Sequence, residues 1–171
     1  RHVVPALRLL RAARAANPIA PKPHTRLGLL AEHFERSEPA AAHFDRAKQL
    51  LPQDPTLWFS SGRAALRRGE FDAAWADWRR SLALSGRHLE AIVTGARQEL
   101  TPDELLERVL PDEPGVVLAA ADLVYPDREA SGRRPFLEAA AAGDRPDATA
   151  ERLVAVARAH DELGRPEDAL R

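Results

Sequence analysis

The apolar positions of this chain recur at the spacing of α-helices rather than of strands. In the stretch 55–88, for example, Ala74, Trp78 and Leu82 lie four residues apart. Alanine and leucine dominate the apolar residues, and both favour helices. β-branched residues are sparse and never alternate with polar residues over the length of a strand. The pattern therefore predicts an all-α protein.

A longer period of 34 residues relates consecutive segments. The segment that begins at Pro55 has Trp58 at its fourth position, Gly62 at its eighth and Gly69 at its fifteenth. The seventeenth, twentieth, twenty-fourth and twenty-eighth positions hold Phe71, Ala74, Trp78 and Leu82. A large residue, a small residue, a turn glycine, an aromatic, an alanine and a second aromatic in this order resemble the tetratricopeptide repeat (TPR) family. The resemblance implies that each segment forms two antiparallel helices.

The same register extends toward the N-terminus. A segment that begins at Pro21 places Leu27 and Gly28 at the seventh and eighth positions. Its twentieth, twenty-fourth, twenty-seventh and thirty-second positions hold Ala40, Phe44, Ala47 and Pro52. Residues 1–20 fill the same four slots of half a segment with Ala6, Leu10, Ala13 and Pro18. We therefore expect a half repeat at 1–20 and full repeats at 21–54 and 55–88.

The register weakens after Arg87. Residues 89–100 predict one helix, and Thr101-Pro102-Asp103-Glu104 is a good start for the next, with a capping hydroxyl, an early proline and early acids. Helices are also expected over 115–125 and 135–142. From Ala150 the register returns, with Leu153, Val156, Ala157 and Gly164 in the expected slots. We expect a short degenerate repeat at 89–114, a degenerate repeat at 115–149 and a truncated repeat at 150–171.

These segments predict a single TPR-like unit over 1–171. It would be a right-handed α-solenoid of antiparallel helix pairs, with about four full repeats plus partial repeats at both ends. Gly62 is expected to let two helices approach closely and Gly69 to end a helix in the left-handed conformation. Trp58, Phe71 and Trp78 are expected in the core. The partial repeats are expected to expose apolar surface, which would favour fraying or end-to-end association.

Charge divides the chain into a basic and an acidic half. Residues 1–88 hold 15 Lys or Arg and 8 Asp or Glu, a net of +7, whereas residues 89–171 hold 10 and 18, a net of −8. This split either orients a partner and favours head-to-tail contacts between copies, or reflects drift in solvated surfaces. The overall charge of −1 argues against a dedicated nucleic-acid binder.

Other features of the composition limit which kinds of protein and which cellular compartments are compatible with the chain. It has no cysteine, so neither a disulfide framework nor a thiolate metal site is expected. No apolar run is long enough to cross a membrane, and no signal peptide opens the sequence. Because methionine is absent even at position 1, we expect a piece of a longer protein. Only Lys22 and Lys48 among 25 basic residues are lysine, which suggests a bacterial source and leaves cytoplasm and periplasm open.

No arrangement of residues predicts catalysis, so the chain is not expected to be an enzyme. Its six histidines form no His-Glu-x-x-His motif, and packing or surface roles are expected for them rather than a metal site. No phosphate-binding loop and no dinucleotide fingerprint occur. The acid pairs Asp112-Glu113 and Asp161-Glu162 are expected to be solvated. No cofactor, no metal and no catalytic residue are therefore predicted.

The resemblance to the TPR family implies a concave groove lined by the first helix of each pair. Carried over to this sequence, the groove positions hold charged and aromatic residues, namely Arg26, His33, Phe59, Arg63, Arg67, Arg97 and Arg158. Arginine occupies the ninth position in three segments, at 63, 97 and 158. Such arginines would bind acidic side chains or a peptide carboxylate through forked hydrogen bonds, unless they are merely solvated.

The predicted function is a protein-protein interaction scaffold that binds a peptide or partner segment, with some acidic character, in this groove. The alternative is a regulatory or positioning appendage of a larger bacterial enzyme or membrane protein, such as a glycan polymerase, a glycosyltransferase or a secretion component. RNA binding by a related repeat is disfavoured by the 34-residue step and the near-zero net charge. No membrane insertion by this chain is expected.

Overall fold

The structure is a computed structural model that describes residues 3–34, 39–127, 130–143, 149–165 and 167, excluding the side chains of residues 3 and 32–34. Within these residues the chain forms helices and turns and no strand, so the predicted all-α class is confirmed there. The contacts divide the chain into two compact units, unit 1 at residues 1–84 and unit 2 at residues 85–171. Each unit is described by itself.

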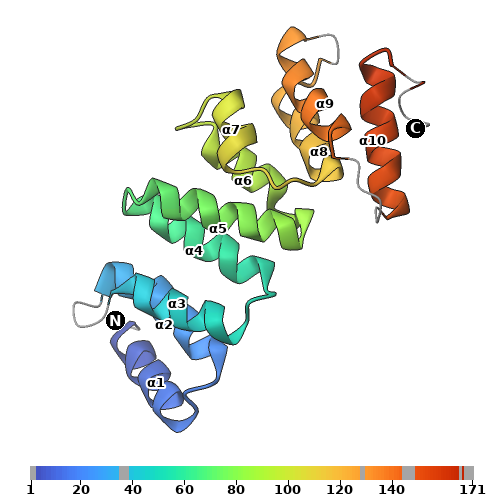
Figure 1. Cartoon of the computed structure of the whole chain (residues 1–171). Coiled ribbons are helices and arrows are strands. Elements are labelled where there is room, and N and C mark those ends of the chain that lie inside the picture. Colours follow the sequence, from blue (N-terminus) through green and yellow to red (C-terminus); the bar gives the residue numbers. More distant parts are fainter. Residues whose placement is uncertain (1–2, 35–38, 128–129, 144–148, 166, 168–171) are drawn as a thin grey trace. The chain divides into compact units, whose positions relative to one another are not determined.

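Unit 1 contains five described helices, drawn from blue to green in Figure 1. They are α1 (Val3–Ala16), α2 (Pro21–Phe34), α3 (Ala40–Leu50), α4 (Pro55–Arg67) and α5 (Phe71–Leu84). Each helix packs against the next one along the chain, and α2 also packs against α4. Two helices thus fall within each of the predicted segments 21–54 and 55–88.

Close contact between α4 and α5 depends on Gly62. A Cβ atom added there would overlap the indole of Trp78, lying 2.6 Å from its Nε1 atom, and would come within 3.0 Å of the carbonyl oxygen of Ala74. Trp78 is 1% exposed, and its Nε1 donates a hydrogen bond to the carbonyl of Phe59 at 3.2 Å. One segment earlier, a Cβ at Gly28 would lie 3.0 Å from the ring of buried Phe44. The predicted packing role of Gly62 is confirmed.

The ends of α4 follow from local sequence. The side chain of Asp54 accepts hydrogen bonds from the backbone amides of Thr56 and Leu57, and Pro55 occupies the first turn, where its missing N–H costs nothing. Beyond the other end of α4, Gly69 has φ +74°, in the left-handed region. The amide of Glu70 then donates to the carbonyl of Ala65, closing the turn. The predicted role of Gly69 is therefore confirmed.

The aromatic residues of unit 1 differ from the expectation. Trp78 is in the core, but Phe71 is 42% exposed, and its assignment to the core is wrong. Phe71 is the first residue of α5, where side chains lean toward the N-terminal end and no preceding turn covers them. Its ring stacks on Trp75, which is 2% exposed and takes the core position instead. Trp58 is half-buried, with Lys48 Nζ lying 4.9 Å from its ring centroid.

Unit 2 contains five described α-helices and two 3₁₀ turns, with the C-terminal helix drawn in red in Figure 1. They are η1 (Gly86–His88), α6 (Leu89–Ala96), α7 (Pro102–Arg108), α8 (Pro114–Val124), η2 (Ser131–Arg133), α9 (Arg134–Ala141) and α10 (Ala150–Glu162). The predicted helix start at Thr101 is confirmed, because Thr101 and Glu104 form a reciprocal capping box. The helix predicted over 89–100 is shorter than expected: it ends at Ala96, whose carbonyl accepts from the amides of Glu99 and Leu100 in a turn.

The core of unit 2 gathers around α8. This helix packs against α6, α9 and α10, and α9 packs against α10. Buried aliphatic and aromatic side chains fill the spaces, among them Ile92, Leu105, Val109, Leu118 and Phe136. None of the described helices in either unit is both long and apolar enough to cross a bilayer.

Candidate functional site

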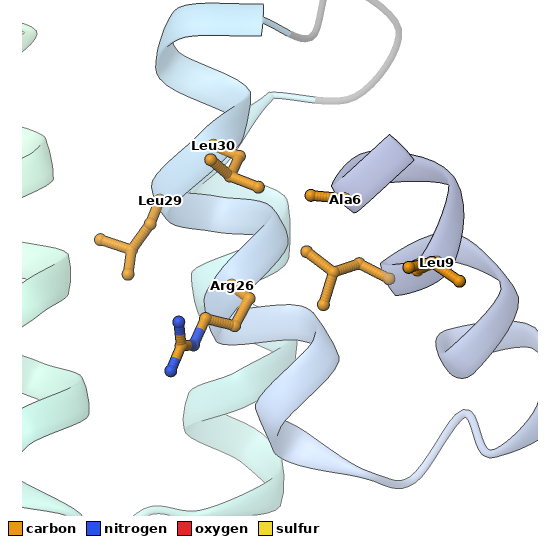
Figure 2. A pocket seen from close by; sticks show the side chains of 6 residues that line it. Ala6, Leu9, Arg26, Leu29 and Leu30 are labelled. Carbon is orange, nitrogen blue, oxygen red and sulfur yellow. The ribbon is translucent and has the colours of Figure 1, made fainter. Parts of the chain in front are cut away.

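An open apolar hollow of about 580 Å³ lies between α1 and α2 in unit 1. We call it the α1/α2 hollow, and it is lined by Ala6, Leu9, Leu10, Arg26, Leu29 and Leu30. Figure 2 shows Ala6 and Leu30 between the two helices, while the side chains of Arg26 and Leu29 extend to the other side of α2 in that view. Leu9 lines this hollow together with other apolar residues and is nevertheless 71% exposed. The hollow therefore offers apolar surface to a ligand.

Arg26 is the predicted groove residue that lies at this hollow. Its side chain is exposed, and it forms no ion pair or hydrogen bond with the part of the chain that the structure describes. An arginine without a partner keeps all five of its N–H donors for a ligand. The α1/α2 hollow thus has apolar walls, and α2, which forms one of them, carries a cation whose side chain extends away from α1 (Figure 2).

The other predicted groove residues of unit 1 lie on α4, apart from His33. Arg63 is exposed, with its guanidinium carbon 5.7 Å from the ring centroid of half-buried Phe59, a cation–π arrangement. Arg67 is the last residue of α4 and is exposed. His33 is in α2, but its side chain lies outside the described residues. The structure thus brings Phe59 and Arg63 into contact, and α2 and α4, which carry Arg26 and Arg63, pack together.

Arg97 lies beside a more polar hollow in unit 2. This hollow has a volume of about 390 Å³ and is lined by Glu90, Val93, Thr94, Arg97, Gln98 and Leu123. Arg97 is exposed and directly follows α6. Apolar contact there is limited mainly to Val93 and Leu123, so the hollow offers polar groups but little surface for an apolar anchor.

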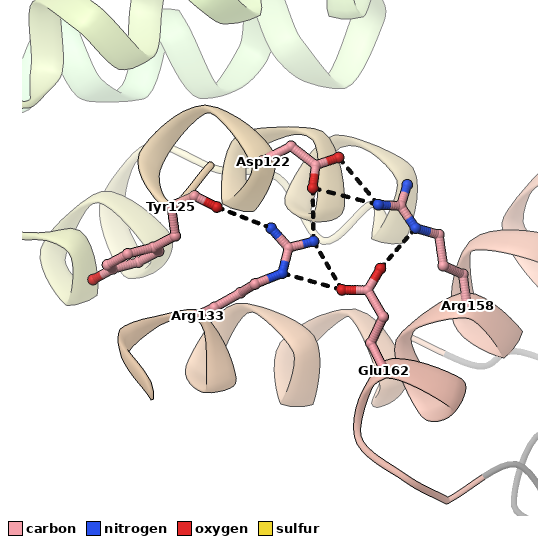
Figure 3. Close-up of polar contacts among 5 residues, drawn as sticks. All are labelled: Asp122, Tyr125, Arg133, Arg158 and Glu162. Atoms are coloured by element: carbon pink, nitrogen blue, oxygen red, sulfur yellow. Dashed lines mark hydrogen bonds and ion pairs between the residues drawn. The ribbon is translucent and has the colours of Figure 1, made fainter. Parts of the chain in front are cut away.

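Arg158, the last predicted groove residue, is engaged within unit 2. It belongs to what we call the ion cluster, formed by Asp122 of α8, Arg133, and Arg158 and Glu162 of α10 (Figure 3). Its Nε donates to Glu162 Oε1 at 2.8 Å, and its Nη2 donates to Asp122 Oδ2 at 3.1 Å. Its side chain is 39% exposed. Both acidic partners of its guanidinium are therefore supplied by the chain itself.

Arg133 occupies the centre of the ion cluster and was not singled out by the sequence. It is 1% exposed, and its Nη2 donates to Asp122 Oδ1 at 2.7 Å and to Glu162 Oε2 at 2.9 Å. Its Nη1 donates to the backbone carbonyl of Tyr125 at 3.4 Å. Two arginines and two carboxylates balance in charge, so the cluster ties α8, the start of α9 and α10 together without leaving an uncompensated ion.

The ion cluster shifts the titration of its members. Burial alone would raise the pKa of Asp122 and of Glu162, but hydrogen bonds and charges from Arg133 and Arg158 outweigh it and lower both pKa values. Burial alone would likewise lower the pKa of Arg158, whereas its two carboxylate partners raise it overall. The carboxylates are thus held in the charged form, which suits a structural tie rather than proton transfer.

A second buried arginine corrects the expectation for the acid pairs. Arg152 is 8% exposed, and its Nε donates to the carbonyl of Gly143 at 2.7 Å, while its Nη1 donates to Glu113 Oε2 at 2.9 Å. Glu162 is similarly enclosed, with 16% of its side chain exposed. The prediction that the acid pairs are solvated is therefore wrong for Glu162, which binds a buried arginine, whereas Glu113 pairs with Arg152 and keeps 45% of its side chain exposed.

The histidines of unit 1 illustrate the packing role expected for them. His24 and His43 are 6% and 1% exposed, and the Nε2 atom of His24 lies 3.1 Å from the carbonyl oxygen of Pro18. Across the described residues, no group of three or more histidine, aspartate or glutamate side chains is placed to hold a metal ion.

Comparison with known proteins adds no assignment to this geometry. No protein-family model matches the chain, and no curated protein shows significant similarity to it.

Proposed function

We propose that this chain is a protein-interaction module whose binding site is the α1/α2 hollow. The observation that carries the proposal is the exposed leucine surface between α1 and α2, with Arg26 on α2, the helix that forms one wall of the hollow. Contiguous exposed apolar surface beside polar groups is characteristic of sites where one protein binds another. The resemblance of the sequence of unit 1 to the TPR family, expected from its 34-residue register, favours the same function.

The chemistry of the hollow suggests the kind of segment it binds. Leu9, Leu10 and Leu30 provide an apolar surface bounded by two helices, which suits the apolar stripe of an amphipathic helix. An acidic residue beside that stripe would pair with Arg26. Arg63 of α4 is a further exposed cation of unit 1, on a helix that packs against α2. The ligand is thus a helical partner segment with acidic flanks.

The experiment uses a displayed library of helical peptides with apolar residues at i, i+3, i+4 and i+7, selected on the wild-type chain. Binders are then measured against Leu9→Arg and Arg26→Glu. We expect Leu9→Arg to weaken binding at least about tenfold, because it places a charge in the apolar contact. Arg26→Glu should weaken it about fivefold, as expected for an ion pair at the rim of an interface.

Two matched variants control for general effects. Leu51→Arg introduces the same charge at a leucine that is 39% exposed outside the hollow. Arg80→Glu changes the net charge as Arg26→Glu does, at an exposed arginine of α5. Both should leave affinity within about twofold, since exposed charges away from the contact are largely screened. The proposal would be contradicted if neither Leu9→Arg nor Arg26→Glu changed the affinity of the selected peptides. It would also be contradicted if the selection yielded no binder.

A further inference from the structure

The more polar hollow of unit 2, of about 390 Å³, is lined by α6, by the two residues that follow it and by α8, and we call it the α6/α8 hollow. Its volume is within the range of sites that bind ligands. Both helices lie in the middle of the chain, with described helices before α6 and after α8. The hollow therefore does not lie at an end of the chain.

Four polar side chains line this hollow, and they carry both signs of charge. All four are exposed, namely Glu90, Thr94, Arg97 and Gln98. None of their side chains forms a hydrogen bond or an ion pair with the residues that the structure describes. The α6/α8 hollow thus presents a carboxylate, a hydroxyl, a guanidinium and an amide to a ligand.

The two charges are held at a fixed separation by α6. Glu90 is in the first turn of this helix and Arg97 directly follows its last residue, so the two are seven positions apart. Seven residues make almost two turns and rise about 10 Å, which returns a side chain to nearly the same face. Ion pairs within a helix form between residues three or four apart, so Glu90 and Arg97 are poorly spaced to neutralise each other. Both charges therefore remain for groups of a ligand.

The rest of the lining favours an extended ligand over a helical one. A bound helix covers a groove with an apolar stripe, but the apolar lining here is limited to buried Val93 and to Leu123, which is 40% exposed. An extended peptide has backbone N–H and C=O groups that need partners, and the hydroxyl of Thr94 and the amide of Gln98 can both donate and accept. Leu123 suits the aliphatic stem of a long charged side chain.

The separation of the two charges limits the ligand further. In the polyproline II conformation, three residues make one turn and rise about 9 Å, so side chains three positions apart lie on the same side. This rise is close to that of about 10 Å between the two charged positions of α6. A base and an acid three positions apart in an extended peptide therefore match Glu90 and Arg97.

We infer that the α6/α8 hollow binds an extended peptide segment of a partner protein that carries a basic and an acidic residue three positions apart. The acidic residue binds Arg97 through forked hydrogen bonds, and the basic residue pairs with Glu90. This site is in unit 2 and requires both signs of charge, whereas the site of the proposed function is in unit 1 and binds the apolar stripe of a helix. The two sites are therefore independent of each other.

The test uses a displayed library of short peptides in which the separation between one basic and one acidic residue varies, selected on the wild-type chain. Peptides with a separation of three positions should be enriched, because only these place both charges on one side at the required distance. Arg97→Glu should weaken their binding at least about tenfold, since it removes a forked pair and adds a repulsion. Glu90→Arg should weaken it about fivefold, as expected for a single exposed ion pair.

Charge reversal in the peptide distinguishes a direct contact from a general effect. A peptide whose acid is replaced by lysine should bind the Arg97→Glu chain within about threefold of the original affinity, because the pair is restored with opposite polarity. The matched controls are Arg134→Glu and Glu107→Arg, at exposed residues of unit 2 outside the hollow. Both should keep affinity within about twofold, since distant exposed charges are screened. Circular dichroism checks that all variants keep their helix content.

Several results would overturn the inference. They are a selection that enriches no particular separation of charges, binding that neither Arg97→Glu nor Glu90→Arg weakens, or a loss that the charge-reversed peptide does not restore. Binding that depends on Arg97 but not on Glu90 would indicate simple attraction of anions and would also overturn it. Peptides whose binding instead depends on Leu9 would occupy the α1/α2 hollow, which removes this inference and leaves the proposed function in place.

Discussion

Two helix contacts, one in each unit, depend on different physical features. In unit 1, α4 and α5 pack closely because Gly62 has no side chain and leaves room for the fully buried indole of Trp78. This contact therefore depends on complementary shape. In unit 2, Arg133 lies almost fully buried between Asp122 and Glu162, so the contact between α8 and α10 is one of charge and hydrogen-bond direction. Unit 1 also contains an enclosed ion pair, Lys48 with Asp77 at 2.7 Å, but no arginine is buried among its described residues.

This difference determines how each of the two contacts responds to substitution. Shape contacts fail when volume is added, because a close-packed interior cannot absorb an extra methyl group without moving its neighbours. Ionic contacts fail when one partner is removed, because the remaining charges lose both their water and their counter-ion. The α4/α5 contact should therefore be sensitive to added volume at Gly62, and the α8/α10 contact to the loss of Arg133.

The largest effect is expected for Arg133→Met, which keeps most of the length of the side chain and removes its charge. We expect a loss of about 3 kcal/mol in the free energy of unfolding, the lower end of the range for a broken buried ion pair. The lower end applies because Asp122 is 40% exposed and can regain water. Denaturant unfolding measures the loss, and hydrogen exchange should show the largest loss of protection in α8 and α10.

The matched control for this variant is the neighbouring residue. Arg134 is exposed and pairs with Glu138 one helical turn away, at 2.8 Å. Arg134→Met should cost about 0.5 kcal/mol or less, as is usual for an exposed pair of this spacing. Equal losses for the two variants would mean that the ion cluster contributes no more than a surface pair, and the contrast between the units would disappear.

A smaller effect is expected for Gly62→Ala in unit 1. The added Cβ would overlap an indole that cannot move freely, since Trp78 is enclosed and donates a hydrogen bond to Phe59. We expect a loss of about 1–3 kcal/mol, the usual cost of overpacking a core. Thermal and denaturant unfolding, followed by tryptophan fluorescence, measure this loss.

Gly115→Ala provides the opposite case in unit 2. Gly115 is in the first turn of α8, and an added Cβ there would meet nothing within 4 Å. Alanine favours a helix over glycine by up to about 1 kcal/mol, so this variant should be neutral or slightly more stable. If Gly62→Ala were as harmless as Gly115→Ala, close approach of α4 and α5 would not explain the glycine.

The same contrast explains which features the sequence could predict. The helices of unit 1 were predictable because packing residues recur every 34 positions and because Gly69 marks a helix end by its conformational freedom. Thr101 marked a helix start in unit 2 by its capping hydroxyl. The exposure of Phe71 was missed because the register gives its position in the segment but not what covers the first turn of a helix. Only the structure shows that Trp75 takes its place.

The ion cluster was beyond such reasoning. Arg133, Asp122 and Glu162 are separated by 11 and 29 residues, and no periodic pattern joins them. A lone arginine in a charged loop is usually solvated, so its sequence context gives no sign of burial. The α1/α2 hollow was partly predictable. Arg26 was predicted from the resemblance to the TPR family, whereas the exposure of Leu9 depends on which helices pack against α1.

The smallest expected effect concerns stability at low pH, and it again distinguishes the two units. Asp122 and Glu162 have lowered pKa values in the folded chain, so they bind fewer protons there than in the unfolded chain, where carboxyl groups titrate near about 4. Their contribution to stability is therefore full above about pH 5 and is lost as the pH falls through their folded pKa values.

The variant Asp122→Asn with Glu162→Gln should be less stable at neutral pH but should lose less stability between about pH 5 and pH 3 than the wild type. Glu70 of unit 1 and Glu104 of unit 2, whose pKa values are also lowered, are present in both proteins and cancel in the comparison. The measurement is the urea midpoint against pH, with Asp103→Asn plus Glu151→Gln as the exposed control, expected to follow the wild-type slope. Parallel curves for the cluster variant and the wild type would show that acid acts elsewhere, and that the charges holding α8 to α10 do not set the acid sensitivity of unit 2.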